Sequence, residues 1–267
     1  MMLSVNGISF AYNCKSVLNG VRFDVAGGEL CSILGNNGAG KSTLLKCILR
    51  VLQPREGSVL IEGEDASHMK RMELARRMGY VAQKESGNAR LTVFDAVLMG
   101  RRPHINWGVG EKDLEVVRGV VEALELEDLS LRYLDELSGG ELQKVVIARA
   151  LAQEPGVMLL DEPTSNLDLR NQLEVMETVR RAVTERGIAA LMAIHDVNLA
   201  LRFSHKFMLL RGGVIFACGG AEVITSGNIQ EVYGVKVEVE TLGERKIIIP
   251  LQTMEAKAVT REEQHAR

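Results

Sequence analysis

Residues 35–43 read GNNGAGKST, and this stretch decides the fold. It matches the phosphate-binding pattern G-x-x-x-x-G-K-[ST] and lies between an apolar run, Leu30–Leu34, and a segment with helical apolar spacing over residues 41–52. The glycines let successive backbone N–H groups converge on one anion, and the helix N-terminus adds partial positive charge. The sequence therefore predicts a polyphosphate site at a strand–loop–helix junction.

All nine residues of this loop are predicted to contact the phosphates. Lys41 adds a full positive charge for the β and γ phosphates, and the Ser42 hydroxyl suits Mg²⁺. Thr43 lies one residue deeper, toward the α phosphate. The predicted phosphate ligands are Gly35, Asn36, Asn37, Gly38, Ala39, Gly40, Lys41, Ser42 and Thr43.

An acidic pair follows a second apolar run, residues 157–160. At the end of a buried parallel strand beside the phosphate loop, Asp161 can hold Mg²⁺ directly or through water. Glu162, one residue later, is expected to point in a different direction from Asp161 and can polarise a water in line with the γ phosphate. Without the loop, a solvated acidic strand end would be the better interpretation; with it, we predict a metal ligand and a general base.

Residues 137–141, LSGGE, predict a second anion site. Ser138 is a good helix N-cap, and Gly139 and Gly140 leave backbone N–H groups exposed at the helix start. A plain capped helix is the alternative, but the position of this motif shortly before the acidic strand favours binding.

The strands and helices alternate, which predicts an α/β fold with a mostly parallel sheet. Residues 92–134 carry helical spacing and no clear strand, so we expect a helical insertion. Residues 235–240 and 246–249 are expected to pair across a Leu242-Gly243 turn. We expect one domain over residues 1–254, with a helical subdomain at about 91–145, and a charged, frayed tail over 255–267.

Composition excludes several protein classes. The chain has 267 residues and a net charge of −3, from 32 basic and 35 acidic residues, which argues against a protein that coats nucleic acid. Aromatic residues make up 4%, which is low for a carbohydrate-binding surface. No apolar run approaches the roughly 20 residues of a membrane span, and no signal peptide is evident, so we expect a soluble, cytoplasmic chain. The four cysteines lack CxxC spacing and are expected to be buried apolar side chains.

Other phosphate-loop enzymes fit less well. A GTPase needs a guanine-specifying Asn-Lys-x-Asp, and a small-molecule kinase needs an arginine-rich lid, and neither is evident.

Instead, the motif order resembles the nucleotide-binding subunit of ABC transporters. The order is the phosphate loop, Gln83, LSGGE, Asp161-Glu162, residues 165–168 (SNLD) and His195, and the resemblance covers residues 3–216. It implies a phosphate-loop core with an antiparallel β subdomain near the N-terminus and an α-helical subdomain. It also implies ATP and Mg²⁺ as ligands.

The resemblance also implies residue roles. Tyr12 stacks on adenine, and Gln83 joins Mg²⁺ or the attacking water to the membrane subunit. Glu162 is the catalytic base, His195 contacts the γ phosphate, and Asp168 reports across a dimer interface. Four other histidines are expected to be structural: His68, His104, His205 and His265. Glu141 stands where glutamine is commoner and is expected to lie outside phosphate contact.

In this family two copies bury two ATP molecules head to tail, with Ser138 of one copy facing the phosphate loop of the other. The implied partners are a second copy, a polytopic permease dimer and, indirectly, an extracytoplasmic substrate-binding protein, at the cytoplasmic face of the membrane. Residues 100–104 (GRRPH), among other stretches, resemble importers of iron chelates, haem or cobalamin. An iron–sulfur scaffold ATPase and an exporter subunit are the alternatives. A groove formed by residues 84–102, with Arg90, Arg101 and Arg102, is expected to receive a permease helix or to be ordinary surface.

Overall fold

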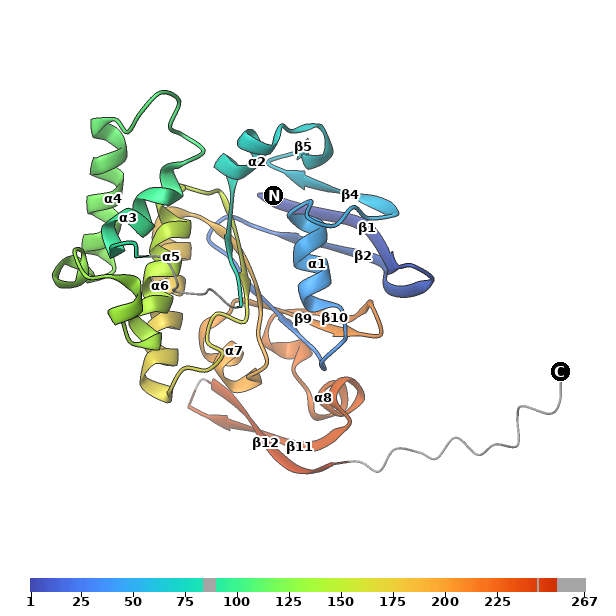
Figure 1. Ribbon diagram of the computed structural model, residues 1–267. Coiled ribbons are helices and arrows are strands. Elements are labelled where there is room, and N and C mark those ends of the chain that lie inside the picture. Colours follow the sequence, from blue (N-terminus) through green and yellow to red (C-terminus); the bar gives the residue numbers. More distant parts are fainter. Residues whose placement is uncertain (84–89, 244, 254–267) are drawn as a thin grey trace, which may run out of the picture.

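The computed structural model describes residues 1–83, 90–243 and 245–253. Its centre is a six-stranded sheet in the order β10-β9-β3-β8-β7-β6 (Figure 1). Five strands are parallel and β10 is antiparallel to its neighbour β9. The strands are β3 (Leu30–Leu34), β6 (Met78–Val81), β7 (Val157–Asp161), β8 (Ala189–Ala193), β9 (Lys206–Arg211) and β10 (Val214–Gly219). The three central strands β3, β7 and β8 are buried at every residue, as expected for a sheet covered on both faces.

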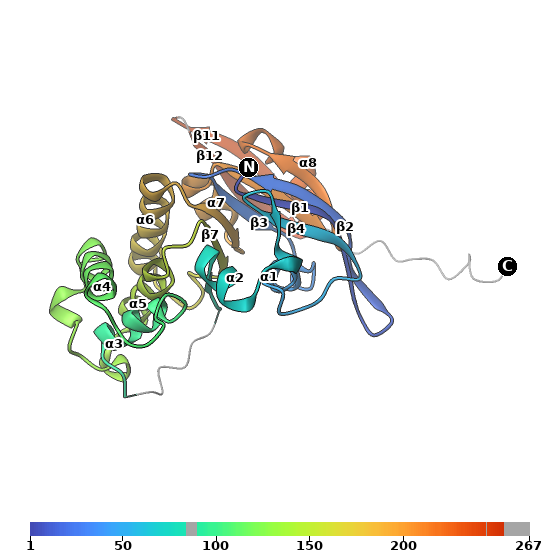
Figure 2. The ribbon, with the colours of Figure 1, turned by 90° about the horizontal axis from the view of Figure 1, so that it is seen from above.

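A second, antiparallel sheet has the order β2-β1-β4-β5, and α1 packs between the two sheets (Figure 2). Its strands are β1 (Leu3–Tyr12), β2 (Lys15–Val25), β4 (Glu56–Ile61) and β5 (Glu64–Asp65). Leu44 and Ile48 of α1 are fully buried against apolar side chains of both sheets. This packing fixes the helix that starts in the phosphate loop.

Helices α3 (Val93–Leu98), α4 (Glu111–Ala123) and α5 (Gly139–Ala152) form a lobe beside the parallel sheet (Figure 1). Among the described residues between 92 and 134 there is one isolated bridge, Thr92 to Tyr133, and no strand, as predicted. The mixed α/β fold is therefore confirmed. The α-helices are α1 (Lys41–Ile48), α2 (Arg71–Arg77), α3 (Val93–Leu98), α4 (Glu111–Ala123), α5 (Gly139–Ala152), α6 (Leu169–Arg186), α7 (Val197–Phe203) and α8 (Ser226–Tyr233), and the short 3₁₀ turns are Ala66–His68, Met99–Arg101, Glu127–Leu129, Leu134–Glu136 and Ala221–Val223.

The predicted C-terminal hairpin is present and longer than expected. Its strands are β11 (Val235–Leu242) and β12 (Arg245–Thr253), which pair in antiparallel register. The helix before it, α8, was not predicted. Its caps are nevertheless visible in the sequence: the Thr225 hydroxyl accepts the N–H of Asn228, and Gly234 ends the helix with φ +67. The expected tail, residues 255–267, lies outside the described residues.

Two predicted helices have different bounds. The helix predicted over residues 41–52 ends at Ile48, because Arg50 adopts φ +57 and the N–H groups of Val51 and Leu52 both donate to the carbonyl of Lys46. The charged stretch of residues 68–78 also predicts a helix from its sequence, but the backbone at Lys70 is extended and α2 begins only at Arg71. It ends before Met78, which pairs with Val157 as the first residue of β6.

The prediction that all four cysteines are buried is wrong for two of them. Cys31 and Cys47 are buried, whereas Cys14 lies exposed in the turn between β1 and β2, and Cys218 lies exposed on the edge strand β10. Turn and edge positions face solvent whatever the polarity of the side chain. In the described part of the chain no helix is long and apolar enough to cross a membrane.

Candidate functional site: a phosphate loop beside three converging polar side chains

The predicted site residues follow four neighbouring strands. The phosphate loop follows β3, His195 follows β8, Asp161 ends β7 with Glu162 directly after it, and Gln83 follows β6. Because the carboxyl ends of parallel strands meet at one edge, these side chains approach each other although they are far apart in sequence.

The loop conformation depends on its glycines. Gly35, Gly38 and Gly40 have φ of +155, +79 and +105, a region that L side chains rarely adopt. At Gly35 a Cβ would also lie 2.3 Å from the carbonyl oxygen of Leu210. Asn36, Asn37 and Gly38 are exposed, so the middle of the loop is open to a ligand.

Lys41 is buried under this loop. Its Nζ donates to the carbonyl oxygens of Gly35 at 2.6 Å and Asn36 at 3.2 Å. Burial lowers the pKa of the Lys41 ammonium, and the nearby carboxylates of Glu162 and Asp161 oppose this shift. A polyphosphate would add negative charge and favour the charged ammonium further.

Ser42 and Asp161 form the expected metal-binding pair. The Ser42 hydroxyl donates to Asp161 Oδ1 at 2.9 Å. Burial raises the pKa of the Asp161 carboxyl, partly offset by the hydrogen bond from Ser42. Hydroxyl and carboxylate oxygens are the ligands that Mg²⁺ prefers, and a divalent cation would stabilise the buried carboxylate, so the residues present fit this ion.

Gln83, Glu162 and His195 converge. Gln83 Nε2 donates to Glu162 Oε2 at 2.5 Å, and His195 Nε2 contacts the other carboxylate oxygen, Oε1. Glu162 is held at φ +52, a left-handed conformation that costs free energy in a residue other than glycine. The N–H of Glu162 donates to the carbonyl of Ala193, which anchors it to β8.

A cavity of about 530 Å³ lies beside the phosphate loop and reaches one of these side chains, Glu162. It runs from the ring of Tyr12, past the phosphate loop, to Glu162. Tyr12 is 48% exposed and is fixed edge-on to Phe10, with ring centroids 4.8 Å apart. A flat, exposed ring at one end and a phosphate loop at the other suit a nucleotide. The full lining is Tyr12, Lys15, Ser16, Val17, Asn37, Gly38, Gly40, Lys41, Ser42, Thr43, Glu162, Gly212 and Gly213.

Seven predicted nucleotide ligands do not line this cavity. Three of them, Gly35, Asn36 and Ala39, belong to the phosphate loop itself, and the other four lie elsewhere: Ser138, Gly139, Gly140 and Asp168. Ser138 caps α5, and its own N–H donates to Glu141 Oε2 at 2.8 Å, closing a capping box. These hydrogen bonds with Ser138 lower the pKa of the Glu141 carboxyl.

The segments that carry these four ligands are joined to each other. Asp168 caps α6 by accepting the N–H of Asn171 at 2.8 Å. A Cβ on Gly140 would lie 2.1 Å from the Asn171 side chain, so α5 and α6 approach closely at this point. Lys144 of α5 and Glu174 of α6 form an ion pair at 2.7 Å.

One contact to the loop was missed in the sequence. Tyr233, the last residue of α8, accepts the N–H of Gly35 at 2.9 Å, and Asn36 Nδ2 donates to the carbonyl of Val232 at 3.0 Å. The caps Thr225 and Gly234 could have revealed the helix, but no sequence signal links it to a loop nearly 200 residues earlier.

Two histidines make structural contacts, as expected. His205 Nδ1 accepts the N–H of Leu30, and His104 Nε2 lies 3.0 Å from the carbonyl oxygen of Gln153.

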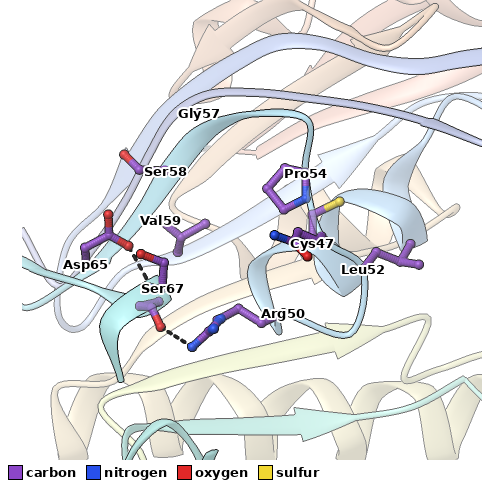
Figure 3. Close-up of a pocket in the computed structure, with 11 residues that line it drawn as sticks. Cys47, Arg50, Leu52, Pro54, Gly57, Ser58, Val59, Asp65 and Ser67 are labelled. Atoms are coloured by element: carbon purple, nitrogen blue, oxygen red, sulfur yellow. Dashed lines mark hydrogen bonds between the residues drawn. The ribbon is translucent and has the colours of Figure 1, made fainter. Parts of the chain in front are cut away.

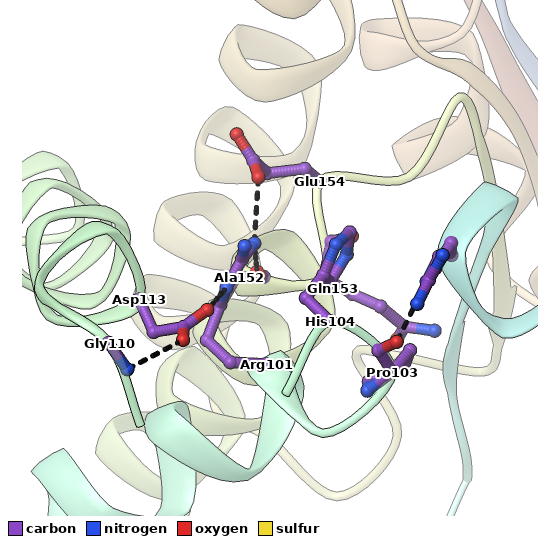
Figure 4. A network of polar contacts seen from close by, with 9 residues as sticks. Arg101, Pro103, His104, Gly110, Asp113, Ala152, Gln153 and Glu154 are labelled. Atoms are coloured by element: carbon purple, nitrogen blue, oxygen red, sulfur yellow. Dashed lines mark hydrogen bonds and ion pairs between the residues drawn. The ribbon is translucent and has the colours of Figure 1, made fainter. Parts of the chain in front are cut away.

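Arg101, one of the arginines considered for partner contact, is only 2% exposed and is not available for it. Its guanidinium bonds to Asp113 Oδ1 at 3.0 Å, to the carbonyl of Ala152 at 2.8 Å and to Glu154 Oε2 at 2.7 Å (Figure 4). It joins the start of α4 to the end of α5. Arg90 and Arg102 remain candidates, and residues 84–89 lie outside the described residues.

A smaller cavity of about 250 Å³ lies between the end of α1, strand β4 and the 3₁₀ turn Ala66–His68 (Figure 3). Its one arginine, Arg50, uses Nη1 to bond the carbonyl oxygens of Ala66 and Met69. Asp65 caps the adjoining 3₁₀ turn by accepting the N–H of Ser67. These charged groups are engaged in holding the turn, so we assign no ligand to this cavity.

Comparison with known proteins identifies the family. The sequence profile of the ABC transporter family matches residues 18–165, more than half of the chain. The chain belongs to the ABC transporter family. An uncharacterized ABC transporter ATP-binding protein from Methanocaldococcus jannaschii is 53% identical over 94% of this chain and 98% of its own. The petrobactin import ATP-binding protein of Bacillus anthracis is 34% identical over 93% of each chain.

Two further comparisons bear on cargo. A phosphonates import ATP-binding protein of Alcaligenes faecalis is 34% identical over 88% of this chain and 89% of its own. A solved structure described as an inward-facing, metal-chelate type ABC transporter superposes with a TM-score of 0.82 and 30% identity, over 94% of this chain and 97% of that one. This ABC protein is therefore an ATP-binding, ATP-hydrolysing subunit whose fold and sequence are similar to those of importer ATPases.

Proposed function

We propose that the 530 Å³ cavity binds ATP and that this ABC ATPase hydrolyses it there. The convergence of Lys41, the Ser42–Asp161 pair and Glu162 around one cavity carries this proposal. Tyr12 stacks on the adenine, and the loop residues 35–43 donate their N–H groups to the phosphates. Lys41 exchanges its bonds to the loop carbonyls for the β and γ phosphates.

Glu162 acts as the general base. Its carboxylate takes a proton from a water, the water oxygen bonds to the γ phosphorus, and the bond from that phosphorus to the bridging oxygen breaks to release ADP. Gln83 and His195 already hold the two carboxylate oxygens, so they orient the base and, with ATP bound, contact the water and the γ phosphate. Mg²⁺ held by Ser42, Asp161 and Gln83 would neutralise charge on the β and γ phosphates.

The second half of the site comes from another copy. Ser138, Gly139, Gly140 and Asp168 lie outside the cavity of their own chain, yet Ser138 presents an exposed helix N-terminus suited to phosphate. A head-to-tail homodimer would bring this tip onto the γ phosphate of the partner, and hydrolysis would release it.

We infer that the ATPase dimer works with a separate permease dimer at the cytoplasmic face of the membrane. An extracytoplasmic binding protein delivers the cargo to the permease. The ATPase binds no nucleic acid. A largely apolar hollow of about 320 Å³, lined by Asp95, Leu98, Met99, Arg102 and Ile105, lies along α3 and suits a short amphipathic permease helix. α3 packs against α5, so a movement of α3 caused by a helix bound in the hollow would be transmitted to Ser138 at the N-terminus of α5.

The inferred cargo is a metal chelate, namely an iron–siderophore complex, haem or cobalamin. The petrobactin relative and the metal-chelate type structure support this class. Phosphonates form the second candidate class, which the Alcaligenes relative supports at the same identity. An iron–sulfur scaffold or an exporter role would instead leave the chain without an importer permease.

Measurements of ATP binding and ATP hydrolysis by the Lys41→Ala variant test the proposed ATP site. We expect affinity for ATP to fall at least about tenfold, because a buried charged hydrogen-bond donor is lost. Lys70→Ala removes an exposed lysine outside the cavity and should bind ATP like the unmodified protein. Full ATP hydrolysis by Lys41→Ala would refute the assignment of the site.

Cargo is tested in vesicles that contain the ATPase and its co-purified permease. Addition of the binding protein loaded with a ferric chelate should stimulate hydrolysis, whereas stimulation by a phosphonate alone would select the second class. Purification without any polytopic membrane protein would favour the scaffold role.

A further inference from the structure

The first N–H of the phosphate loop lies where the sheet ladder ends. β3 stops at Leu34, which pairs with Leu209 of β9, and the next residue, Gly35, is buried. A buried N–H needs an acceptor, and here it is the hydroxyl oxygen of Tyr233 at 2.9 Å. A side chain from the C-terminal part of the chain therefore completes the hydrogen bonding of the loop.

A second bond reinforces the first. Asn36 Nδ2 donates to the carbonyl of Val232 at 3.0 Å, so two successive loop residues are held by the last turn of α8. That turn is fixed in place, because Val232 is 3% exposed and Gly234 reverses the chain with φ +67. Burial raises the pKa of the Tyr233 hydroxyl to about 12, so it remains neutral at physiological pH.

The hairpin after α8 anchors this helix at a distance from the loop. Asn198 of α7 donates to the carbonyl of Ile248 at 3.0 Å and accepts the N–H of Ile248 at 2.8 Å. Helix α7 begins directly after Asp196, the neighbour of His195. The unit formed by α8, β11 and β12 therefore contacts the start of the phosphate loop and the helix that follows His195.

We propose that Tyr233 is a positioning residue for ATP binding: its hydroxyl holds Gly35 so that the loop keeps the shape that receives the phosphates. This inference rests on the proposed binding of ATP at the loop. Tyr233 does not line the 530 Å³ cavity, and the hydrogen bonds described for Glu162, Gln83 and His195 do not involve it, so it acts on binding and not on the chemical step.

Tyr233→Phe removes the hydroxyl and keeps the ring. The N–H of Gly35 then has no acceptor in the loop conformation that the structure shows. Loop conformations that expose this N–H to water therefore become populated. If the binding-competent fraction falls to about a tenth, the Kd and KM for ATP rise about tenfold, while kcat stays within about twofold. Hydrogen exchange of the peptide covering residues 35–41 should be faster than in the unmodified protein.

Tyr133→Phe is the matched control, because Tyr133 is 45% exposed in the helical lobe. It should change neither KM nor loop exchange. The inference is overturned if Tyr233→Phe keeps the original KM and loop exchange while Lys41→Ala has lost ATP binding, or if it lowers kcat and leaves KM unchanged. Retention of ATP binding by Lys41→Ala would instead refute the proposed ATP site itself, so the two failures are distinguishable.

Discussion

Replacing Arg101 by methionine should destabilise the helical lobe strongly. The guanidinium is 2% exposed and makes three hydrogen bonds. Loss of the bond to Asp113, whose side chain is 13% exposed, leaves a largely buried carboxylate with no cation beside it and only the N–H of Gly110 as a hydrogen-bond partner, which costs about 1.5–3 kcal/mol. The unpaired carbonyl of Ala152 adds about 1 kcal/mol, and the half-exposed Glu154 adds less than about 1 kcal/mol. We therefore expect a loss of about 4 kcal/mol, in the range of about 3–5 kcal/mol measured when buried ion pairs are broken.

Thermal unfolding measures this loss. For a chain of this size about 4 kcal/mol corresponds to a decrease in Tm on the order of 10 °C. Arg118→Met is the matched control in α4: the Arg118–Glu111 pair is 3.3 Å long and exposed at both ends, so less than about 1 kcal/mol is expected.

A double variant isolates the unpaired charge. Asp113→Asn can still accept the N–H of Gly110 but carries no charge, so adding it to Arg101→Met should recover part of the lost stability. Two results would refute the reasoning: an Arg101→Met variant that melts within about 2 °C of Arg118→Met, or a double variant no more stable than Arg101→Met.

Three further predictions concern dimerisation, permease coupling and thiol chemistry. Glu162→Gln should retain ATP without hydrolysing it and elute as a dimer with ATP in gel filtration, because the base is lost and the phosphate ligands remain. Met99→Asp should abolish stimulation by the permease and leave basal hydrolysis unchanged, because it places a charge in the apolar hollow along α3. Alkylation, followed by peptide mass spectrometry, should reach Cys47 only after unfolding, because its side chain is 1% exposed and burial also raises its pKa to about 11. Desolvation also raises the pKa of the Cys218 thiol, so its alkylation rate should level off at a higher pH than that of free cysteine measured alongside it.

Each of these has a contrary outcome. Wild-type hydrolysis by Glu162→Gln would remove the base assignment, and an exclusively monomeric elution at high concentration would count against the dimer. Met72→Asp, at a similarly exposed methionine of α2, should keep permease stimulation; its loss there too would show a nonspecific effect. A rate at Cys218 that levels off at the same pH as free cysteine, or below it, would contradict the raised pKa.

The sequence predicts Glu162 beside the phosphate loop, because each follows an apolar run of a parallel sheet and the carboxyl ends of such strands meet at one edge. The roles of Gln83 and His195 are instead implied by the resemblance to the ABC family. These residues lie up to 112 positions apart in the sequence, and the sheet order that places β6, β7 and β8 side by side comes from the structure.

Burial and long-range contacts could not be predicted in this way. Arg101 has the same sequence context as the exposed Arg102, and only the packing of α4 against α5 supplies its partners Asp113 and Glu154. The contact of Tyr233 with Gly35 likewise depends on where α8 docks. The exposure of Cys14 and Cys218 follows from a turn and a sheet edge, which residue polarity does not report.

The close approach of α5 to α6 has a mechanical consequence. Since Gly140 lies against Asn171 and Lys144 is paired with Glu174, neither helix can slide past the other without a clash or a broken ion pair. The serine at the tip of one helix and the aspartate at the tip of the other must therefore travel together. In the proposed dimer, a displacement of α5 would carry the start of α6 with it.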